Sequence, residues 1–193
     1  MKYNINARIS NRHVHLTKEV YELLFDEDIS KRNDLNQVGE FASNQVLTIR
    51  NGDKKIENVR VLGPFRNYTQ IEISKRDARI LGVNPPVRRS GDLLGSSKII
   101  LETSKASLLT DGLIIANRHV HMNLDDAKKM GVEDKQVVQI KVDGDKSGIM
   151  DAEVKITENG VLEMHIDTDD ANSFLINDFD KVEMIVWVFL LEM

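Results

Sequence analysis

The sequence predicts a mainly β protein, either a barrel or a sandwich, that is built from two related halves. Two observations support the fold class: the predicted strands are short and separated by glycine-rich turns, and the predicted helices are short as well. A third observation supports the duplication, because the motif Asn-Arg-His-Val-His occurs at residues 11–15 and again at residues 117–121. These two copies contain four of the five histidines in the chain.

The composition is that of an ordinary globular protein, and 193 residues suffice for one large domain or two small ones. The absence of cysteine excludes disulfides, thiolate metal sites and a cysteine nucleophile, and it favours a reducing compartment. The net charge of −5 argues against general nucleic-acid binding. No apolar signal-peptide segment follows Met1. The longest apolar run, residues 184–191, is too short to span a membrane and is expected to be a buried strand.

In the first half, alternating apolar and β-branched residues predict five strands. They cover residues 3–16, 46–49, 56–62, 69–74 and 98–102. Thr17 is expected to cap a helix that reaches residue 25, and Ser74 a helix that reaches residue 81 before Gly82. Asn51-Gly52 is expected to form a type I′ hairpin turn, whereas the polar residues 26–45 are expected to form an excursion with little regular structure.

The second half follows a similar order of elements. The expected strands cover residues 113–121, 136–142, 150–156, 161–167 and 181–190. Asn123 is expected to cap a helix that ends before Gly131, and Asp167 caps a second short helix. Asp143-Gly144 is expected to turn the hairpin between the second and third of these strands.

The repeated histidine motif suggests metal binding. Successive side chains of a strand point to opposite faces, so His13 and His15 share one face while Val14 points toward the core. His119 and His121 share a face in the same way. Two imidazoles about 6–7 Å apart along one strand face can converge on a single ion, and imidazole is the commonest metal ligand.

The repeat continues beyond the histidines. Glu72 lies on a strand before a capped helix that contains Asp77-Ala78, and His165 lies on a strand before a capped helix that contains Asp170-Ala171. Each half therefore supplies a third candidate ligand, which is Glu72 in the first half and His165 in the second. Three protein ligands with an open position are typical of a catalytic zinc site, although cobalt, nickel, manganese or iron would also suit these donors.

Simpler interpretations stay open for several of these residues. A single histidine is usually not a ligand, and Glu72 could be an exposed strand residue. Arg12 and Arg118 point to the strand face opposite the histidines, and we expect them to be structural rather than catalytic. Basic residues outnumber acidic ones in residues 66–89, which indicates either a site for an anionic ligand or a solvated mixed surface.

Four segments resemble the PduL-type phosphate propanoyltransferase (phosphotransacylase) family. They are Ser10-Asn-Arg-His-Val-His-Leu16, the block from Leu62-Gly-Pro-Phe-Arg66 to Ile73-Ser74, Val87-Arg-Arg-Ser-Gly-Asp92, and Val161-Leu-Glu-Met-His-Ile-Asp-Thr-Asp169. The resemblance covers essentially the whole chain. It implies two β-barrels capped by short helices, with the active site in the cleft between them, where two zinc ions are held.

The resemblance also implies how the chain divides and which residues act. One barrel would comprise residues 12–113, including the excursion at about 26–45, and the other would comprise residues 1–11 and 114–193. One zinc would be held by His13, His15 and Glu72, and the other by His119, His121 and His165. Arg66 and Ser90 match the positions that the family places beside the metals.

The implied reaction exchanges a short acyl group, propanoyl or acetyl, between coenzyme A and phosphate. Without cysteine the simplest route is direct attack by bound phosphate on the thioester. Arg66 would bind phosphate and stabilise the transition state, and Ser90 would donate a hydrogen bond or be an ordinary turn residue. The candidates for contact with the nucleotide phosphates of coenzyme A are Lys75, Arg76, Arg88 and Arg89. A metal-dependent thioester or acyl-phosphate hydrolase, and a non-catalytic module stabilised by metals, are the alternatives.

The resemblance further implies a cytoplasmic protein or one enclosed in a bacterial microcompartment, as in propanediol degradation. Microcompartment members of the family carry an amphipathic encapsulation extension, and we expect none here because few residues precede the first motif. We expect a homodimer or higher homo-oligomer, with microcompartment shell proteins or enzymes as possible partners and with no binding to nucleic acid or membrane.

Overall fold

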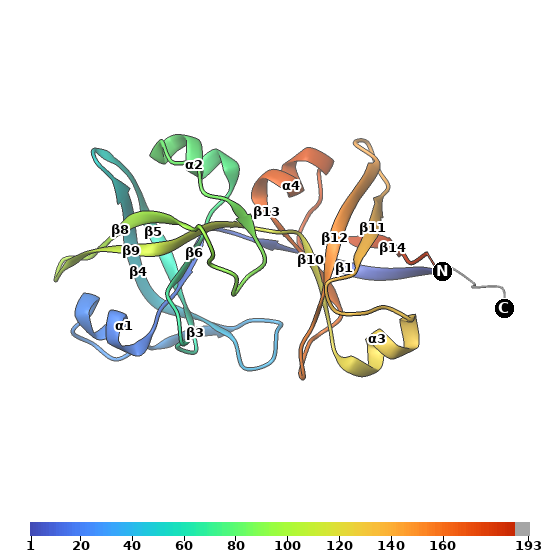
Figure 1. Cartoon of the computed structure of the whole chain (residues 1–193), viewed down its shortest axis with the longest axis horizontal. Helices are drawn as coiled ribbons and strands as arrows, with labels where there is room; N and C mark the ends of the chain where they lie inside the picture. The colour runs from blue at the N-terminus through green and yellow to red at the C-terminus, as the bar shows by residue number, and fades with distance from the viewer. Residues whose placement is uncertain (188–193) are drawn as a thin grey trace. The chain divides into compact units, whose positions relative to one another are not determined.

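The computed structural model describes residues 1–187. The chain forms two compact units, each with its own hydrophobic core. The N-terminal unit comprises Asn11–Ala116, and the C-terminal unit comprises Met1–Ser10 together with the chain from Asn117 onward. Figure 1 shows that both units consist mainly of strands with short helices beside them, which confirms the predicted fold class.

In the N-terminal unit, six strands close into a barrel in the order β4-β5-β2-β6-β9-β8, with β8 pairing back to β4. These strands are β2 (His13–His15), β4 (Phe41–Asn51), β5 (Lys54–Gly63), β6 (Gln70–Glu72), β8 (Ser97–Glu102) and β9 (Ser107–Ala116). The short strands β3 (Lys31–Asp34) and β7 (Val87–Arg88) add to β4 and β9. Figure 1 shows α1 (Lys18–Leu24) and α2 (Lys75–Leu81) on opposite sides of this barrel.

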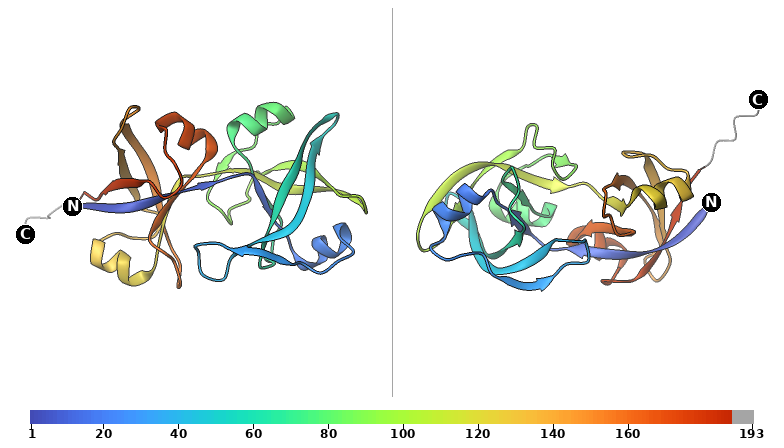
Figure 2. Two further views of the ribbon diagram at one scale, coloured as in Figure 1. Left: turned by 180° about the vertical axis from the view of Figure 1, so that it is seen from behind. Right: turned by 90° about the horizontal axis from the view of Figure 1, so that it is seen from below.

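The C-terminal unit is a second closed barrel, with the order β1-β13-β10-β12-β11-β14. Its strands are β1 (Lys2–Ser10), β10 (His119–Met122), β11 (Val137–Val142), β12 (Gly148–Ile156), β13 (Glu163–Asp167) and β14 (Lys181–Ile185). The helices are α3 (Leu124–Met130) and α4 (Thr168–Phe174). Figure 2 shows the blue first strand beside the red last strands, because β1 pairs with both β13 and β14.

The two barrels repeat one pairing scheme around their histidine strands. β2 pairs in parallel with β5 and antiparallel with β6, and β10 pairs in parallel with β12 and antiparallel with β13. The central valines Val14 and Val120 are fully buried in the two cores, as strand alternation predicts. Each barrel therefore turns the two histidines of its strand away from its apolar interior.

All four predicted helix starts are confirmed. Thr17, Ser74, Asn123 and Asp167 each accept a hydrogen bond from a backbone N–H in the first turn of the helix that follows. Gly82 and Gly131 end α2 and α3 with left-handed backbone (φ 67° for both), as expected for helix C-caps. No helix within residues 1–187 is long and apolar enough to cross a membrane.

Two predicted continuous strands are interrupted. Residues 3–16 form β1 and β2 with a break at Asn11-Arg12, and residues 113–121 cover the end of β9 and the start of β10 with a break at Asn117-Arg118. Both breaks lie where the chain passes from one unit to the other. Local alternation of apolar residues carries no information about such a change of partner strands, so the sequence pattern extended both strands too far.

Three further expectations need correction. The segment 26–45, expected to be irregular, contains β3 and the first residues of β4. Asn51 pairs with Lys54, so the hairpin loop is Gly52-Asp53 rather than Asn51-Gly52, and Gly52 takes the positive φ of 57°. The final strand β14 ends at Ile185, and the part of the expected strand beyond residue 187 lies outside the described residues.

We predict that Gly112→Ala destabilises the N-terminal unit by about 3 kcal/mol or more. Gly112 has a φ of 105°, and an added Cβ would overlap the carbonyl oxygen of Thr69, at the point where β9 pairs with β6. Gly131→Ala is the matched control, because its φ is also positive but nothing lies within 4 Å, so about 1 kcal/mol is expected. Urea unfolding measures both variants, and equal losses would contradict the close approach at Gly112.

Candidate active site

The first cluster of candidate ligands lies in the N-terminal unit. β2 supplies His13 and His15, and β6 supplies Glu72, which lies directly opposite His13 in the antiparallel pair. One ligand atom from each side chain lies within 4.8 Å of the others. The two imidazole rings are 5.0 Å apart, and all three residues are buried. The structure thus brings together the first three residues proposed from the repeat.

The second cluster repeats this arrangement in the C-terminal unit. β10 supplies His119 and His121, and β13 supplies His165 directly opposite His119. The three rings have centroid separations of 4.6–5.3 Å, and the Nε2 atoms of His119 and His121 are 3.0 Å apart. Their candidate ligand atoms also lie within 4.8 Å of one another. All five histidines of the chain therefore belong to these two clusters.

The backbone before each motif orients the first histidine of each pair. His13 Nδ1 is 2.8 Å from the carbonyl oxygen of Asn11, and His119 Nδ1 is 2.8 Å from that of Asn117. Because a carbonyl oxygen only accepts hydrogen bonds, the proton belongs on Nδ1 and the lone pair is left on Nε2. This is the arrangement in which imidazole binds a metal ion, with the other ring nitrogen held by a backbone carbonyl. The donor sets of the two clusters, and the orientation of His13 and His119, therefore fit a zinc-like ion.

The arginines of the two motifs serve the neighbouring helices. Arg12 Nε is 3.0 Å from a carboxylate oxygen of Asp77 in α2, and Arg118 Nε is 3.1 Å from one of Asp170 in α4. Burial raises the pKa of Asp170 above its ordinary value, nearby Asp167 raises it further, and Arg118 offsets part of this rise. The arginines thus link each histidine strand to the helix that follows the third ligand. This is consistent with the structural role expected for them.

Arg66 and Ser90 lie in the same unit as the first cluster and contact each other. Arg66 Nη1 is 3.5 Å from Ser90 Oγ and 3.2 Å from the hydroxyl of Tyr68, and Nη2 forms an ion pair of 2.8 Å with Glu40. Ser90 belongs to the loop that follows β7. The structure therefore places the two candidate catalytic side chains together.

Gln70 joins Ser90 to the first cluster, and the sequence interpretation had assigned it no role. Its Nε2 donates to Glu72 Oε1 (2.5 Å) and to Ser90 Oγ (2.9 Å), while its Oε1 accepts from the backbone N–H of Gly91 (2.8 Å). The side chain is fully buried, so these three bonds fix the orientation of the amide. The only signal in the sequence was that Gln70 alternates onto the same strand face as Glu72.

Glu163 is the second residue that the sequence interpretation assigned no role. It is only 1% exposed, and its Oε1 is 2.8 Å from Nε2 of His165 on the same face of β13. An almost fully buried carboxylate is rare unless it is paired. Its position two residues before the candidate ligand His165 matches that of Gln70 before Glu72.

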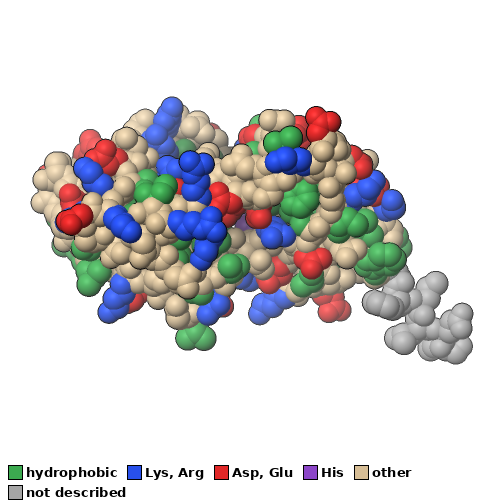
Figure 3. Space-filling view, turned by 90° about the horizontal axis from the view of Figure 1, so that it is seen from above, with side chains coloured by type: hydrophobic (Ala, Val, Ile, Leu, Met, Phe, Trp, Pro, Cys, Tyr) green, Lys and Arg blue, Asp and Glu red, His purple; other side chains and the backbone are tan. Residues whose placement is uncertain are grey.

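The basic candidates for coenzyme A lie on α2 and on the segment around β7. Lys75 and Arg76 are exposed in the first turn of α2, and Arg88 and Arg89 lie at the end of β7 and just after it. Lys75 Nζ bonds Asn84 (2.7 Å), and Arg88 Nε bonds the carbonyl oxygen of Leu94 (2.8 Å). Figure 3, which views the molecule from the side of α2, shows several Lys and Arg side chains at the surface of this unit.

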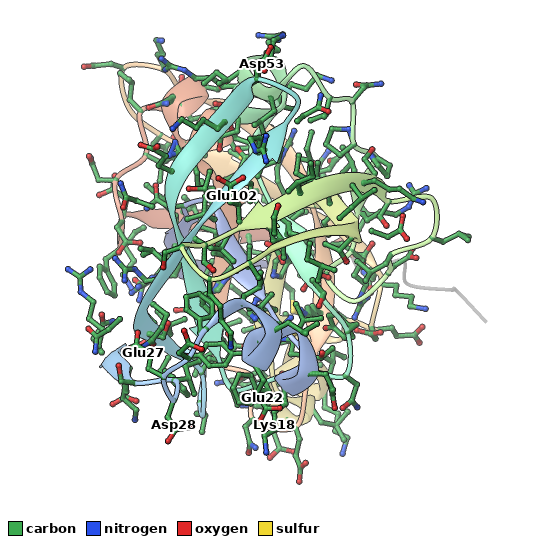
Figure 4. The ribbon with its side chains drawn as sticks, turned by 90° about the vertical axis from the view of Figure 1, so that its left-hand side faces the viewer. Lys18, Glu22, Glu27, Asp28, Asp53 and Glu102 are labelled. Carbon is green, nitrogen blue, oxygen red and sulfur yellow. The ribbon has the colours of Figure 1, made fainter. Side chains whose placement is uncertain are left out.

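A polar cavity of about 740 Å³ lies elsewhere in the N-terminal unit and contains none of the candidate residues. Its wall includes Asp26, Glu27, Glu57 and Glu102, with Lys105 among them. Figure 4 shows the labelled Glu27 and Glu102 on this side of the barrel, with Glu22 and Asp28 near α1. A wall rich in carboxylates repels anions, so this cavity does not suit a phosphorylated substrate.

Comparison with known proteins gives a consistent result. A family model described as phosphate propanoyltransferase matches residues 6–177. A phosphate propanoyltransferase of Thermotoga maritima is 44% identical over 182 residues, which cover 92% of this chain and 87% of the relative. Those of Limosilactobacillus reuteri and Shewanella putrefaciens are 40% identical over 182 residues and 42% identical over 169 residues. They cover 90% and 86% of this chain, and 85% and 80% of the relatives.

The fold, the clusters and these matches together define an enzyme of the acyltransferase class. The chain belongs to the phosphate propanoyltransferase family. This confirms the family resemblance identified from the sequence motifs, and the match runs through both barrels.

We predict that Gln70→Glu lowers kcat/KM for acyl transfer by about 10- to 100-fold. The substitution removes both amide N–H donors and places a carboxylate against Glu72. The new carboxylate still accepts the N–H of Gly91, so the loop keeps that bond. Gln136→Glu is the matched control, since its side-chain oxygen accepts from the N–H of Glu133 and a carboxylate would do the same. Steady-state kinetics on both variants measures the effect, and similar kinetics for the two would remove Gln70 from the site.

Proposed function

We propose that this protein is a zinc-dependent phosphate acyltransferase. It interconverts a short-chain acyl-CoA, propanoyl-CoA or acetyl-CoA, and phosphate with the acyl phosphate and coenzyme A. The observation that carries this proposal is the hydrogen-bond chain from Glu72 through Gln70 to Ser90 and Arg66. It connects a candidate metal ligand to a hydroxyl and a guanidinium, which are groups that recognise phosphate. The names of the relatives support the same reaction.

The metal ligands in this proposal are the two clusters. One zinc would be held by His13, His15 and Glu72, and the other by His119, His121 and His165. Three protein ligands leave a coordination position for a substrate oxygen, as in catalytic zinc sites. When bound, zinc supplies Lewis-acid stabilisation of negative charge on phosphate, on the thioester oxygen or on the leaving thiolate.

The side chains of the N-terminal unit would bind and orient phosphate. Arg66 is held by Glu40 and Tyr68, so its guanidinium is placed before substrate arrives, and a planar guanidinium can contact two phosphate oxygens. Ser90 Oγ, already within reach of Arg66, would donate a hydrogen bond to phosphate. Gln70 would hold the side chains of Ser90 and Glu72 in position, because its amide donates a hydrogen bond to each of them.

The absence of cysteine limits the chemical routes that are open to this enzyme. An acyl group cannot pass through a cysteine thioester on this enzyme, and direct attack of a phosphate oxygen on the thioester carbonyl is the simplest route. The new C–O bond forms, the C–S bond breaks, and the electron pair leaves with sulfur to give the thiolate of coenzyme A. The nucleotide phosphates of coenzyme A are proposed to contact four basic residues near the surface of the same unit. These residues are Lys75, Arg76, Arg88 and Arg89.

The decisive experiment combines metal analysis with thiol release. We expect about two zinc ions per chain in the purified enzyme, and thiol release from propanoyl-CoA or acetyl-CoA that requires added phosphate. Chelation should abolish this release, and zinc should restore it. Release that proceeds without phosphate would instead show a hydrolase that uses water on the same ligands, and a metal-free protein without turnover would rule out the proposed site.

We predict that Arg66→Ala lowers kcat/KM for phosphate by about 10²- to 10³-fold, because a fixed cation that stabilises the charged transition state is lost. Arg66→Lys should recover only part of the rate, since a point charge cannot replace the planar guanidinium. Arg32→Ala, an exposed arginine on β3 of the same unit, is the control and should retain the wild-type rate. Turnover of Arg66→Ala within a few-fold of wild type would contradict the role given to this arginine.

A further inference from the structure

The outer face of strands β11 and β14 in the C-terminal barrel has an apolar patch. Ile185 of β14 lies opposite Gln139 of β11, and the indole N–H of Trp187 donates to the side-chain oxygen of Gln139 (3.3 Å). Val137 shares this face, because it lies two residues before Gln139 on the same strand. Trp187 is 65% exposed and Val137 is 62% exposed, while Ile185 is half-buried. Figure 3 shows hydrophobic side chains at the surface of the C-terminal unit near the point where the described chain ends.

Two lysines beside this patch already have acidic partners within the chain. Lys2 lies opposite Ile185 across the other edge of β14, and its Nζ is 2.8 Å from Glu183. Lys141 of β11 forms an ion pair of the same length with Asp143. An apolar centre with a polar rim is the usual composition of a protein interface, and paired rim charges do not repel the same pairs on another molecule.

The apolar sequence continues past the described residues. Residues 188–191 are Val-Phe-Leu-Leu, so every position from 184 to 191 is apolar. Such an uninterrupted run is typical of a strand that is covered on both faces. The barrel covers only one face, because Met184 and Val186 are buried in its core whereas Trp187 lies on the outer face. The outer face therefore needs a cover that the barrel does not supply.

The chain's own barrel is a poor partner for residues 188–191. Within the described residues the C-terminal barrel is closed, and β14 is already paired with β1 and β11, so no strand edge is free for this segment. The sequence from 187 to 191 also contains no glycine, proline, asparagine, aspartate or serine, which are the residues that dominate turns. It thus lacks a local signal for folding back over Trp187, and the cover is expected from another molecule.

A second copy of the chain offers a complementary surface. In a dimer with twofold symmetry the same patch is used by both subunits, so an apolar patch meets an apolar patch. A stable interface buries about 800 Å² on each partner, which is more than three side chains can expose. Residues 188–191 add four large apolar side chains directly after Trp187, and buried aromatic residues are prominent among those that contribute most to binding.

We propose that the outer face of β11 and β14 at Val137, Ile185 and Trp187, together with residues 188–191, is a self-association surface. Its occupant is the same surface of a second copy of this chain. The surface includes none of the candidate metal ligands, so this inference does not depend on the proposed function.

The first test uses the full-length wild-type chain. Trp187 is the one tryptophan in the sequence, so tryptophan fluorescence reports directly on this surface. Sedimentation velocity and the emission spectrum are measured over the same dilution series. We expect dimers that dissociate on dilution. The emission maximum should move to longer wavelength at the same concentrations, because Trp187 then becomes exposed to water.

The second test introduces a charge into the patch. Val137→Lys should raise the dissociation constant of the dimer at least about 10-fold, because charged residues are excluded from the centre of an interface. Val87→Lys on β7 of the N-terminal unit is the matched control, since Val87 is 55% exposed on a strand and receives the same charge. It should associate as the wild type does. Phe189→Lys should weaken association as Val137→Lys does, and thermal melting establishes that each variant is folded.

Each outcome decides for or against the proposal. Dimers that are weakened by Val137→Lys and Phe189→Lys but not by Val87→Lys would support it. A chain that is monomeric at every concentration would overturn it, and short-wavelength emission from that monomer would show that the chain covers Trp187 itself. Dimers whose dissociation leaves the emission of Trp187 unchanged would also overturn it, by placing the interface elsewhere. This last measurement needs no variant, so it stands even if a substituted chain does not fold.

Discussion

The antiparallel pairing between each histidine strand and the strand that supplies the third candidate ligand sets the geometry of both clusters. His13 lies opposite Glu72 and His119 lies opposite His165, so the side chains that converge belong to one face of a two-strand ladder. A shift of one residue in this register would turn the third side chain into the core and bring an apolar neighbour to the cluster. The fully buried Ile71 and Met164, which occupy the core side, oppose such a shift.

The same ladders connect the clusters to the rest of each barrel. Asp77 belongs to the capping box of α2 and also binds Arg12 of the first histidine motif. Asp170 in the first turn of α4 binds Arg118 in the same way. The helix that follows each third ligand is therefore attached to the strand that supplies the first two. In the N-terminal unit β6 is also supported by β9, which pairs with the edge of β6 opposite β2. This pairing brings Gly112 of β9 close to the backbone of Thr69.

The two clusters are similar in geometry and different in chemistry. The N-terminal unit joins its cluster to Ser90 and Arg66 through the donor amide of Gln70, which suits the binding of a phosphate beside the candidate metal ligands. In the C-terminal unit, a carboxylate oxygen of Glu163 lies 2.8 Å from Nε2 of His165. Membership of the phosphate propanoyltransferase family agrees with a substrate that contains phosphate. The two barrels share the same strand pairing around their clusters, while the side chains beside the third candidate ligands differ.

The sequence by itself determined the mainly β fold, the helix caps and the membership of the two clusters. These features depend on local periodicity and on a repeated motif, and both can be recognised along one strand. Only the tertiary structure decided that β1 and β2 are separate strands, that Asn51 belongs to β4 rather than to the turn, and that residues 31–34 form a strand. It also revealed the buried contacts of Gln70 and Glu163. Their importance lies in hydrogen bonds to side chains and to the distant Ser90-Gly91 loop, and the spacing of residues along the chain does not encode which donor meets which acceptor.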